Sequence, residues 1–203
     1  MIQRRALRAL AGLGLLAAIP FLAACQRNVE QPPLAGATMG GPFTLTDQDG
    51  RRVSDTAFAG KYRLVYFGYS FCPDVCPTDL ALIGAGLRQF EARDPTRAAK
   101  VQPIFISVDP ARDTPPVLKR YVAAFHPRLI GLTGTPAEIA RVAREYAVYY
   151  QAQPPADGAP PNAYLVDHSR MITLYDPQGR PMAILPEDQG PAGIANELDR
   201  WVR

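Results

Sequence analysis

Cysteine, histidine and tryptophan are scarce in this sequence, whose 203 residues include three cysteines, two histidines and one tryptophan. Three cysteines are too few for a small scaffold held together by disulfides. The hydrophobic share of 47% and the charged share of 20% are ordinary for a domain with its own core. The length suits one domain with appended segments. Any thiol or imidazole chemistry must therefore come from very few side chains.

The sequence also lacks a large net charge. The formal net charge is +3, but Arg4, Arg5 and Arg8 lie in an N-terminal segment that we expect to be removed. Without these three of the 22 basic residues, 19 basic residues face 19 acidic ones. A neutral domain with no basic stretch interleaved with aromatic residues gives no reason to expect nucleic-acid binding.

Residues 1–25 have the pattern of a bacterial lipoprotein signal peptide. The arginines precede an apolar stretch from Ala9 to Ala24, which Pro20 interrupts and which is short for a membrane span. The string Leu-Ala-Ala-Cys at its end resembles a lipobox, in which Cys25 is diacylated and becomes the mature N-terminus. We therefore expect a lipid-anchored protein on the periplasmic, oxidising side of the bacterial cell envelope. An uncleaved anchor helix with an incidental cysteine is the alternative.

The rest of the chain predicts one α/β domain behind a tether. Residues 26–41 are polar, contain proline and glycine and lack periodicity, which is typical of a flexible tether. In the domain, residues 42–203, alternating patterns predict β-hairpins over 43–53 and 171–185 and strands over 64–68, 101–107 and 164–167. Helices are expected after Cys76, over 118–125, over 135–146 and at the C-terminus. This order predicts a mixed central sheet flanked by helices, with an N-terminal β-hairpin.

A cysteine motif directly after the first central strand favours a thioredoxin-like fold. A flavodoxin-like fold would need phosphate-binding glycines there, and the sequence has none. The motif reads Cys72-Pro73-Asp74-Val75-Cys76-Pro77. A residue before proline is biased away from the α region, so both cysteines are expected in the loop or at the helix boundary. With Pro77 at the first helical position, Cys76 would lie at or near the N-cap, where the helix dipole favours a thiolate. In an oxidising compartment Cys72 and Cys76 form either a disulfide or a maintained dithiol.

Two thiolates alone would leave a soft metal under-coordinated, so a third ligand is expected from a histidine. His126 follows a helix, where a surface or capping role is expected. His168 lies between a strand and the second hairpin, where redox thioredoxin folds carry a cis-proline that faces the cysteine motif. By that analogy His168 should point at the two sulfurs. A set of two cysteines and one histidine suits Cu(I), Cu(II) or zinc, and three ligands leave a position open for passing the metal on.

Three segments together resemble the Sco/SenC family over about residues 40–203. They are Phe67–Thr78 with the cysteine motif, Ser107–Pro115, and Leu165–Ser169 with His168. Ser70 stands where the family often has threonine. The resemblance implies a thioredoxin-like protein that binds copper through Cys72, Cys76 and His168. It also implies delivery of copper to the dinuclear copper site of cytochrome c oxidase subunit II, or maintenance of that site's thiols. A second periplasmic copper chaperone or a thioredoxin-like reductase would be a further partner.

Five charged residues lie within these three segments. Asp109, Arg112 and Asp113 belong to a family motif, and we expect them to form a buried carboxylate–arginine network that fixes the loop. Asp74 and Asp167 either support the ligands through hydrogen bonds or are solvated loop acids, and the sequence does not decide between these roles.

Three functions remain open at this stage. A copper metallochaperone is a binding protein and not an enzyme, whereas a thiol–disulfide oxidoreductase would use the same dithiol to reduce a partner. His168 separates these two, because only the chaperone needs it. A copper or redox sensor is the third. Thiol peroxidase is disfavoured, because the pattern Pro-x-x-x-Thr-x-x-Cys does not precede Cys72.

Overall fold

The computed structural model describes residues 30–203, so the predicted signal peptide and Cys25 lie outside the described residues. The strands are β1 (Thr44–Asp47), β2 (Arg52–Ser54), β3 (Tyr62–Gly68), β4 (Val101–Ser107), β5 (Ile130–Thr133), β6 (Tyr150–Ala152), β7 (Val166–His168), β8 (Ile172–Tyr175) and β9 (Pro181–Leu185). The helices are the 3₁₀ helix η1 (Asp55–Phe58), α1 (Val75–Arg93), α2 (Pro95–Ala98), α3 (Pro115–Ala123), α4 (Pro136–Glu145) and α5 (Gly190–Trp201).

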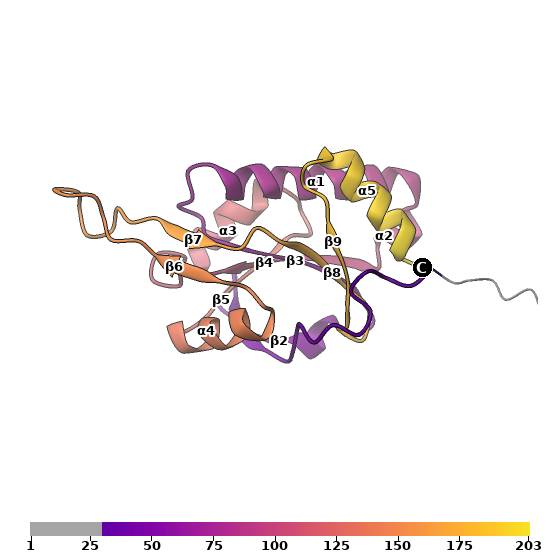
Figure 1. The fold of residues 1–203 in the computed structure, drawn as a ribbon, viewed down its shortest axis with the longest axis horizontal. Helices are drawn as coiled ribbons and strands as arrows, with labels where there is room; N and C mark the ends of the chain where they lie inside the picture. The colour runs from indigo at the N-terminus through magenta and orange to yellow at the C-terminus, as the bar shows by residue number, and fades with distance from the viewer. Residues whose placement is uncertain (1–29) are drawn as a thin grey trace, which may run out of the picture. The chain divides into compact units, whose positions relative to one another are not determined.

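Seven strands form a mixed sheet in the order β2-β1-β5-β4-β3-β8-β9, and β6 and β7 form a separate two-stranded sheet (Figure 1). Strand β3 lies inside the sheet, where it runs parallel to β4 and antiparallel to β8. Every residue of β3 is buried, as expected for a strand covered on both faces. The unit β3-α1-β4 beside the β8-β9 hairpin and α5 confirms the predicted thioredoxin-like fold.

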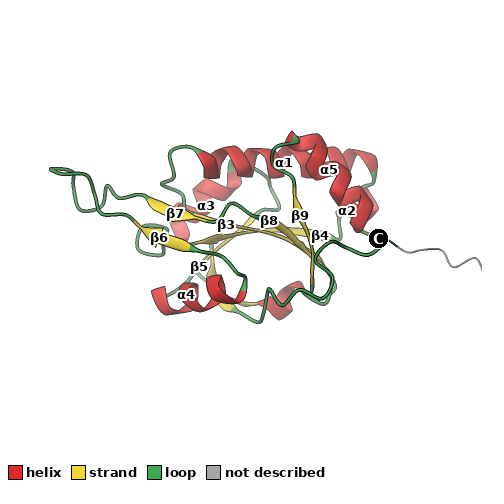
Figure 2. Ribbon diagram, viewed as in Figure 1, coloured by secondary structure: helices red, strands yellow, loops and turns green. Residues whose placement is uncertain are grey.

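Helices cover both faces of the seven-stranded sheet. Figure 2 shows α1, α3 and α5 on one face, with α4 and η1 on the other. The close approach of α1 and α5 depends on Gly86, because a Cβ at this position would lie only 2.7 Å from the Cβ of Ile194. Helix α4 begins with the predicted capping box: Glu138 N–H donates to the Thr135 hydroxyl (3.2 Å), and the Glu138 carboxylate accepts from Thr135 N–H (2.7 Å).

The two predicted hairpins use the same turn chemistry. In β1–β2 the carboxylate of Asp47 accepts from the N–H groups of Asp49 and Arg51, both at 2.9 Å. In β8–β9 the carboxylate of Asp176 accepts in the same way from Gln178 (2.9 Å) and Arg180 (2.8 Å). Each turn ends in a glycine with a positive φ, which explains the Asp-x-x-Gly pattern in both places.

Some features differ from the sequence-based expectations. The packed part of the chain begins at Gln31, earlier than the predicted domain start at residue 42. Leu34 N–H donates to the Met182 carbonyl (2.9 Å) and Gly40 N–H to the Glu145 carbonyl (2.7 Å), so residues 31–41 lie against the domain. The short strands β5 and β6 were not predicted, because three or four residues are too few to show a period. Within residues 30–203, no helix combines the length and apolarity needed to cross a bilayer.

Candidate metal centre

The two cysteines of the domain lie on either side of the start of α1, with Cys72 in the β3–α1 loop and Cys76 in the helix. Helix α1 begins at Val75 with Asp74 as its N-cap, two residues before the predicted start at Pro77, so Cys76 lies inside the first turn. Pro77 is tolerated there because the first N–H groups of a helix have no intrahelical acceptor. Cys76 is fully buried and Cys72 is partly exposed. The N–H of Cys76 donates to the Sγ of Cys72 at 3.4 Å.

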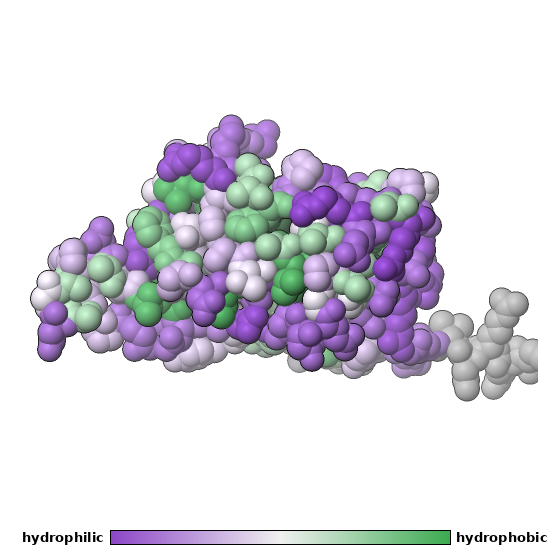
Figure 3. All heavy atoms as spheres, turned by 90° about the horizontal axis from the view of Figure 1, so that it is seen from above, coloured by the Kyte–Doolittle hydropathy of each residue, from purple (hydrophilic) through white to green (hydrophobic). Residues whose placement is uncertain are grey.

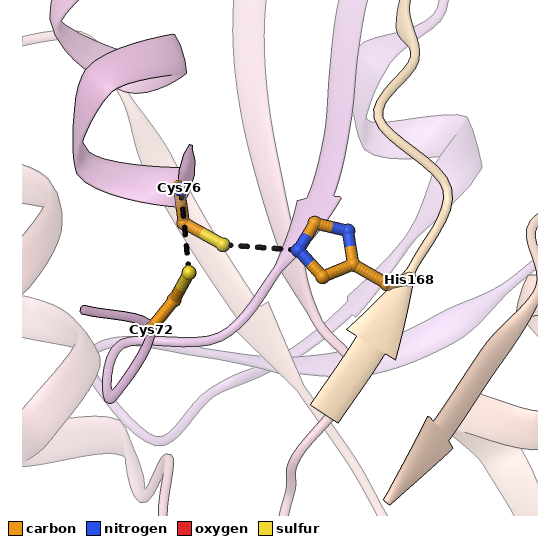
Figure 4. Close-up of side chains that lie close together, drawn as sticks. All are labelled: Cys72, Cys76 and His168. Carbon is orange, nitrogen blue, oxygen red and sulfur yellow. Dashed lines mark hydrogen bonds between the residues drawn. The ribbon is translucent and has the colours of Figure 1, made fainter. Parts of the chain in front are cut away.

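The structure brings the two cysteines and His168 together, although His168 is 92 residues beyond Cys76 in the chain (Figure 4). The Nε2 of His168 lies 3.1 Å from the Sγ of Cys76. The two sulfurs and one imidazole nitrogen all lie within 4.8 Å of one another. Side chains from the β3–α1 loop, the first turn of α1 and the end of β7 thus offer three donor atoms to a single metal ion.

Surrounding groups fix the orientation of the His168 ring. In the tautomer with a proton on Nδ1, this nitrogen donates to the Ser169 carbonyl at 3.0 Å, and Nε2 keeps its lone pair toward Cys76. The rings of Tyr66 and Tyr69 lie edge-on to the imidazole, with centroids 6.1 and 6.0 Å away. Burial lowers the pKa of His168, which favours the neutral imidazole that binds metals.

The two thiols differ in acidity, in the opposite sense to the sequence-based expectation. Burial strongly raises the pKa of Cys76, whose side chain points into the core beside Gly68. Burial also raises the pKa of Cys72, but hydrogen bonds from the N–H groups of Cys76 and Asp74 outweigh it, so the pKa lies below that of a free thiol. The expectation of a favoured thiolate at Cys76 is therefore wrong. The N–H groups at the start of α1 stabilise the thiolate of Cys72, because α1 begins before Cys76.

Asp109 and Arg112 form the buried carboxylate–arginine pair that the sequence predicts. The Arg112 guanidinium stacks 3.6 Å from the ring centroid of Tyr164 and donates to the carbonyls of Asn162 (3.0 Å) and Tyr164 (2.8 Å). The Tyr164 hydroxyl donates to Asp109 at 2.7 Å. These contacts join the loop after β4 to the arm of residues 153–165 that connects β6 with β7.

Asp113 was expected in the same network, but this expectation is wrong: Arg112 pairs with Asp109, and the Asp113 carboxylate binds serines instead. Its fully buried carboxylate accepts from the N–H of Ser70 at 2.9 Å and from the hydroxyls of Ser70 and Ser107. Burial raises the pKa of Asp113. Because Ser70 is two residues before Cys72, Asp113 holds the loop that presents the cysteines. The serine at position 70 thus has a structural partner.

The remaining predicted residues lie outside the immediate centre. The side chain of Asp74 makes no capping hydrogen bond, and the exposed Asp167 accepts from Gln153 Nε2 at 2.6 Å. His126 is buried, and the expected surface role is wrong: its Nδ1 accepts from Arg128 N–H (3.2 Å), and its Nε2 lies 3.4 Å from Glu91. Its position after a helix did not reveal that the loop folds inward.

Three large hydrophobic side chains on segments next to the proposed ligands are exposed to solvent. Phe71, Tyr149 and Leu165 are 51%, 62% and 52% exposed, and they lie beside Cys72 or on the segments that lead into and out of the β6–β7 arm. On the face seen in Figure 3, hydrophobic residues gather on the half nearer to this arm. A hollow of about 450 Å³ lies at the base of the arm, lined by residues that include Val108, Tyr150 and Tyr164.

Comparisons with known proteins agree on one family. A sequence model of the SCO1/SenC family matches residues 31–203. The protein SenC of Rhodobacter capsulatus is 41% identical over 176 residues, which is 87% of this chain and 75% of SenC. The mitochondrial protein SCO2 of Saccharomyces cerevisiae is 45% identical over 142 residues, which is 70% of this chain and 46% of SCO2. The chain spans less than half the length of this yeast protein.

Solved structures resemble the fold as well. A structure of Bradyrhizobium japonicum ScoI with copper bound is 45% identical in sequence and has a TM-score of 0.71. The match covers 81% of the present chain and 99% of the ScoI chain. A second structure is the thioredoxin domain of a thiol-disulfide oxidoreductase from Bacteroides vulgatus, which is 18% identical and has a TM-score of 0.56. The match covers 81% of the present chain and 96% of that domain, and it supports the thioredoxin-like fold alone.

Proposed function

The chain belongs to the SCO1/SenC family, and from this premise we propose that it is a copper metallochaperone. It binds one copper ion through Cys72, Cys76 and His168 and passes it to the dinuclear copper site of cytochrome c oxidase subunit II. The observation that carries the proposal is the convergence of two sulfurs and one imidazole nitrogen within 4.8 Å.

The donor set matches copper as a cargo. Thiolates are soft ligands that select Cu(I), and imidazole also suits copper. Structural zinc sites are usually closed by four protein ligands, whereas three ligands leave a position for an incoming group. Cys72 is the more exposed of the two thiols. An acceptor thiolate would therefore enter on the side of Cys72, and copper would move by stepwise exchange of ligands. The copper-bound ScoI, 45% identical to this chain, supports the choice of metal.

A second function uses the same dithiol, and the difference between the two thiols favours it. The accessible Cys72, with its lowered pKa, would attack a disulfide of the partner and release one partner thiolate. The released partner thiolate would take the proton of the buried Cys76 thiol. Cys76 Sγ would then attack Cys72 Sγ, which forms the Cys72–Cys76 disulfide and releases the second sulfur of the partner as a thiolate. Nothing in this exchange requires His168. A copper or redox sensor is a further alternative that would use the same three residues.

An anaerobic copper titration tests the primary proposal. The fully reduced domain is expected to bind one copper per chain, because one set of ligands is present. X-ray absorption should show sulfur scatterers together with a nitrogen at about 2.0–2.1 Å, by analogy with other imidazole–metal bonds. A titration of the protein with a preformed Cys72–Cys76 disulfide is the control and should show no binding. A copper spectrum with only oxygen and nitrogen ligands would contradict the proposed ligand set.

We also propose that the protein is a lipoprotein of the bacterial cell envelope. Residues 1–25 would act as the signal peptide, Cys25 would carry the lipid, and residues 26–30 would link it to the packed domain in the periplasm. The lipobox-like string before Cys25 and the arginines near the N-terminus support this arrangement.

Substitution of Cys25 tests the anchor. The Cys25→Ser variant is expected to lose its lipid, because serine cannot receive the thioether-linked lipid. It should still bind one copper in solution, since Cys25 is not one of the three proposed ligands. Mass spectrometry of the wild-type protein should find a lipid-modified Cys25 at the mature N-terminus. An N-terminus at any other residue would show that the chain is anchored differently.

A further inference from the structure

The proposed ligands belong to two parts of the fold that share no strand ladder. Cys72 lies in the loop before α1 and Cys76 in the first turn of α1, which packs on the seven-stranded sheet (Figure 2). His168 ends β7, whose pairing in the described chain is with β6 in the separate two-stranded sheet. Residues 169–171, between β7 and β8, lie in no strand. Backbone pairing therefore does not set the distance between His168 and the sulfurs.

An ion pair between Asp79 and Arg170 connects these two parts of the fold. Asp79 lies three residues after Cys76, on the same side of α1. Arg170 lies two residues after His168. Its Nε donates to Asp79 Oδ2 at 2.9 Å, and its second nitrogen donates to Oδ1 at 2.5 Å. The side chain of Asp79 is only 1% exposed, whereas that of Arg170 is 40% exposed. Such bidentate pairs between an arginine and a carboxylate fix the orientation of the two side chains as well as the distance between them.

The same carboxylate also joins the central strand. The hydroxyl of Tyr66, on β3, donates to Asp79 Oδ2 at 2.8 Å. The Tyr66 ring lies edge-on to the His168 imidazole, with an angle of 84° between the planes. Helix α1, strand β3 and the segment after His168 thus meet at the buried carboxylate of Asp79. This carboxylate accepts two hydrogen bonds from Arg170 and one from Tyr66.

We infer that Asp79, Arg170 and Tyr66 are positioning residues that hold the His168 imidazole against the two sulfurs before copper arrives. The inference rests on the proposed function, because it treats the positioned groups as copper ligands. A ligand held in place loses little freedom when the metal binds, whereas a mobile one must be ordered at the expense of affinity. Loss of such supporting groups typically lowers metal affinity about 10- to 100-fold.

Three variants and one matched control test the inference. The variants are Asp79→Asn, Arg170→Leu and the double variant of both. The control is Glu91→Gln, because Glu91 is also a carboxylate on α1 that pairs with an arginine, Arg128, but lies fifteen residues beyond Cys76 in the sequence. In the reduced, copper-free protein, nuclear Overhauser contacts between the His168 ring and the Cys76 Hβ protons report the position of the imidazole. Anaerobic competition titration reports copper affinity, and thermal unfolding reports stability.

The wild type and Glu91→Gln are expected to show the His168–Cys76 contact and equal copper affinity. Arg170→Leu should lose the contact and bind copper about 10- to 100-fold more weakly. It should also unfold at a lower temperature, because Asp79 is left as an unpaired buried charge. The double variant should recover much of that stability, since neither charge remains, but it should recover neither the contact nor the affinity. Restored stability without restored positioning separates this role from a structural one.

Three outcomes distinguish a failure of the positioning role from a failure of the proposed copper function. If the double variant keeps both the His168–Cys76 contact and wild-type copper affinity, the positioning role is wrong. The same conclusion follows if copper affinity simply tracks thermal stability across all four variants, Glu91→Gln included. If the variants lose the contact in the copper-free protein while the wild type fails to bind copper, the positioning role holds and the copper proposal fails.

Discussion

Replacement of Cys72 or Cys76 with serine is expected to lower copper affinity by more than about 100-fold, beyond the usual effect of changes outside the ligand shell. A serine hydroxyl is a hard, neutral donor and cannot replace a soft thiolate for Cu(I). Each substitution leaves one sulfur and one imidazole, which cannot form the three-ligand site. Anaerobic titration of each reduced variant against a competing Cu(I) chelator measures the effect.

Oxidation provides a matched test without any substitution. A Cys72–Cys76 disulfide should lose copper binding to the same extent, and reduction should restore it fully, because both sulfurs are consumed in the bond. Cys25→Ser is the control for a general effect of removing a thiol and should bind one copper. The ligand assignment fails if Cys72→Ser or Cys76→Ser still binds one equivalent with wild-type affinity.

Replacement of His168 with alanine is expected to weaken copper binding by at least about tenfold while the fold and the dithiol stay intact. The imidazole ends a short strand of the two-stranded sheet, so its loss removes a donor without opening the main core. The two thiolates would then hold copper without their third ligand. His126→Asn is the control for loss of a histidine: His126 is buried beside Glu91, so the variant should lose stability but keep copper affinity.

The main elements of the fold and the cysteine pair could be predicted because their signals are local. The buried strand before Cys72, the Asp-x-x-Gly turns and the capping box at Thr135 each depend on a few neighbouring residues. His168 could be paired with the cysteines because a thioredoxin-like fold places its segment opposite the motif. The structure agrees with that placement, with 3.1 Å between His168 Nε2 and Cys76 Sγ.

The features that the sequence did not reveal depend on exact helix starts and on distant pairs. A shift of the α1 start from Pro77 to Val75 is enough to transfer the stabilising N–H groups from Cys76 to Cys72. Asp79 is a single acid within an otherwise apolar helix face, and its partner Arg170 is 91 residues away. Only the folded chain shows that this carboxylate is buried and paired.

The proposed function requires that copper held by His168 and the two cysteines supports oxidase assembly. One strain that carries His168→Ala tests it, with copper affinity of the purified protein and cytochrome c oxidase activity of the cells measured together. We expect both to fall, and added copper should partly restore the activity. The variant should still reduce a disulfide-bonded peptide of subunit II at the wild-type rate, because thiol exchange does not need an imidazole. Weak copper binding with normal oxidase assembly would contradict the chaperone and favour the thiol reductase.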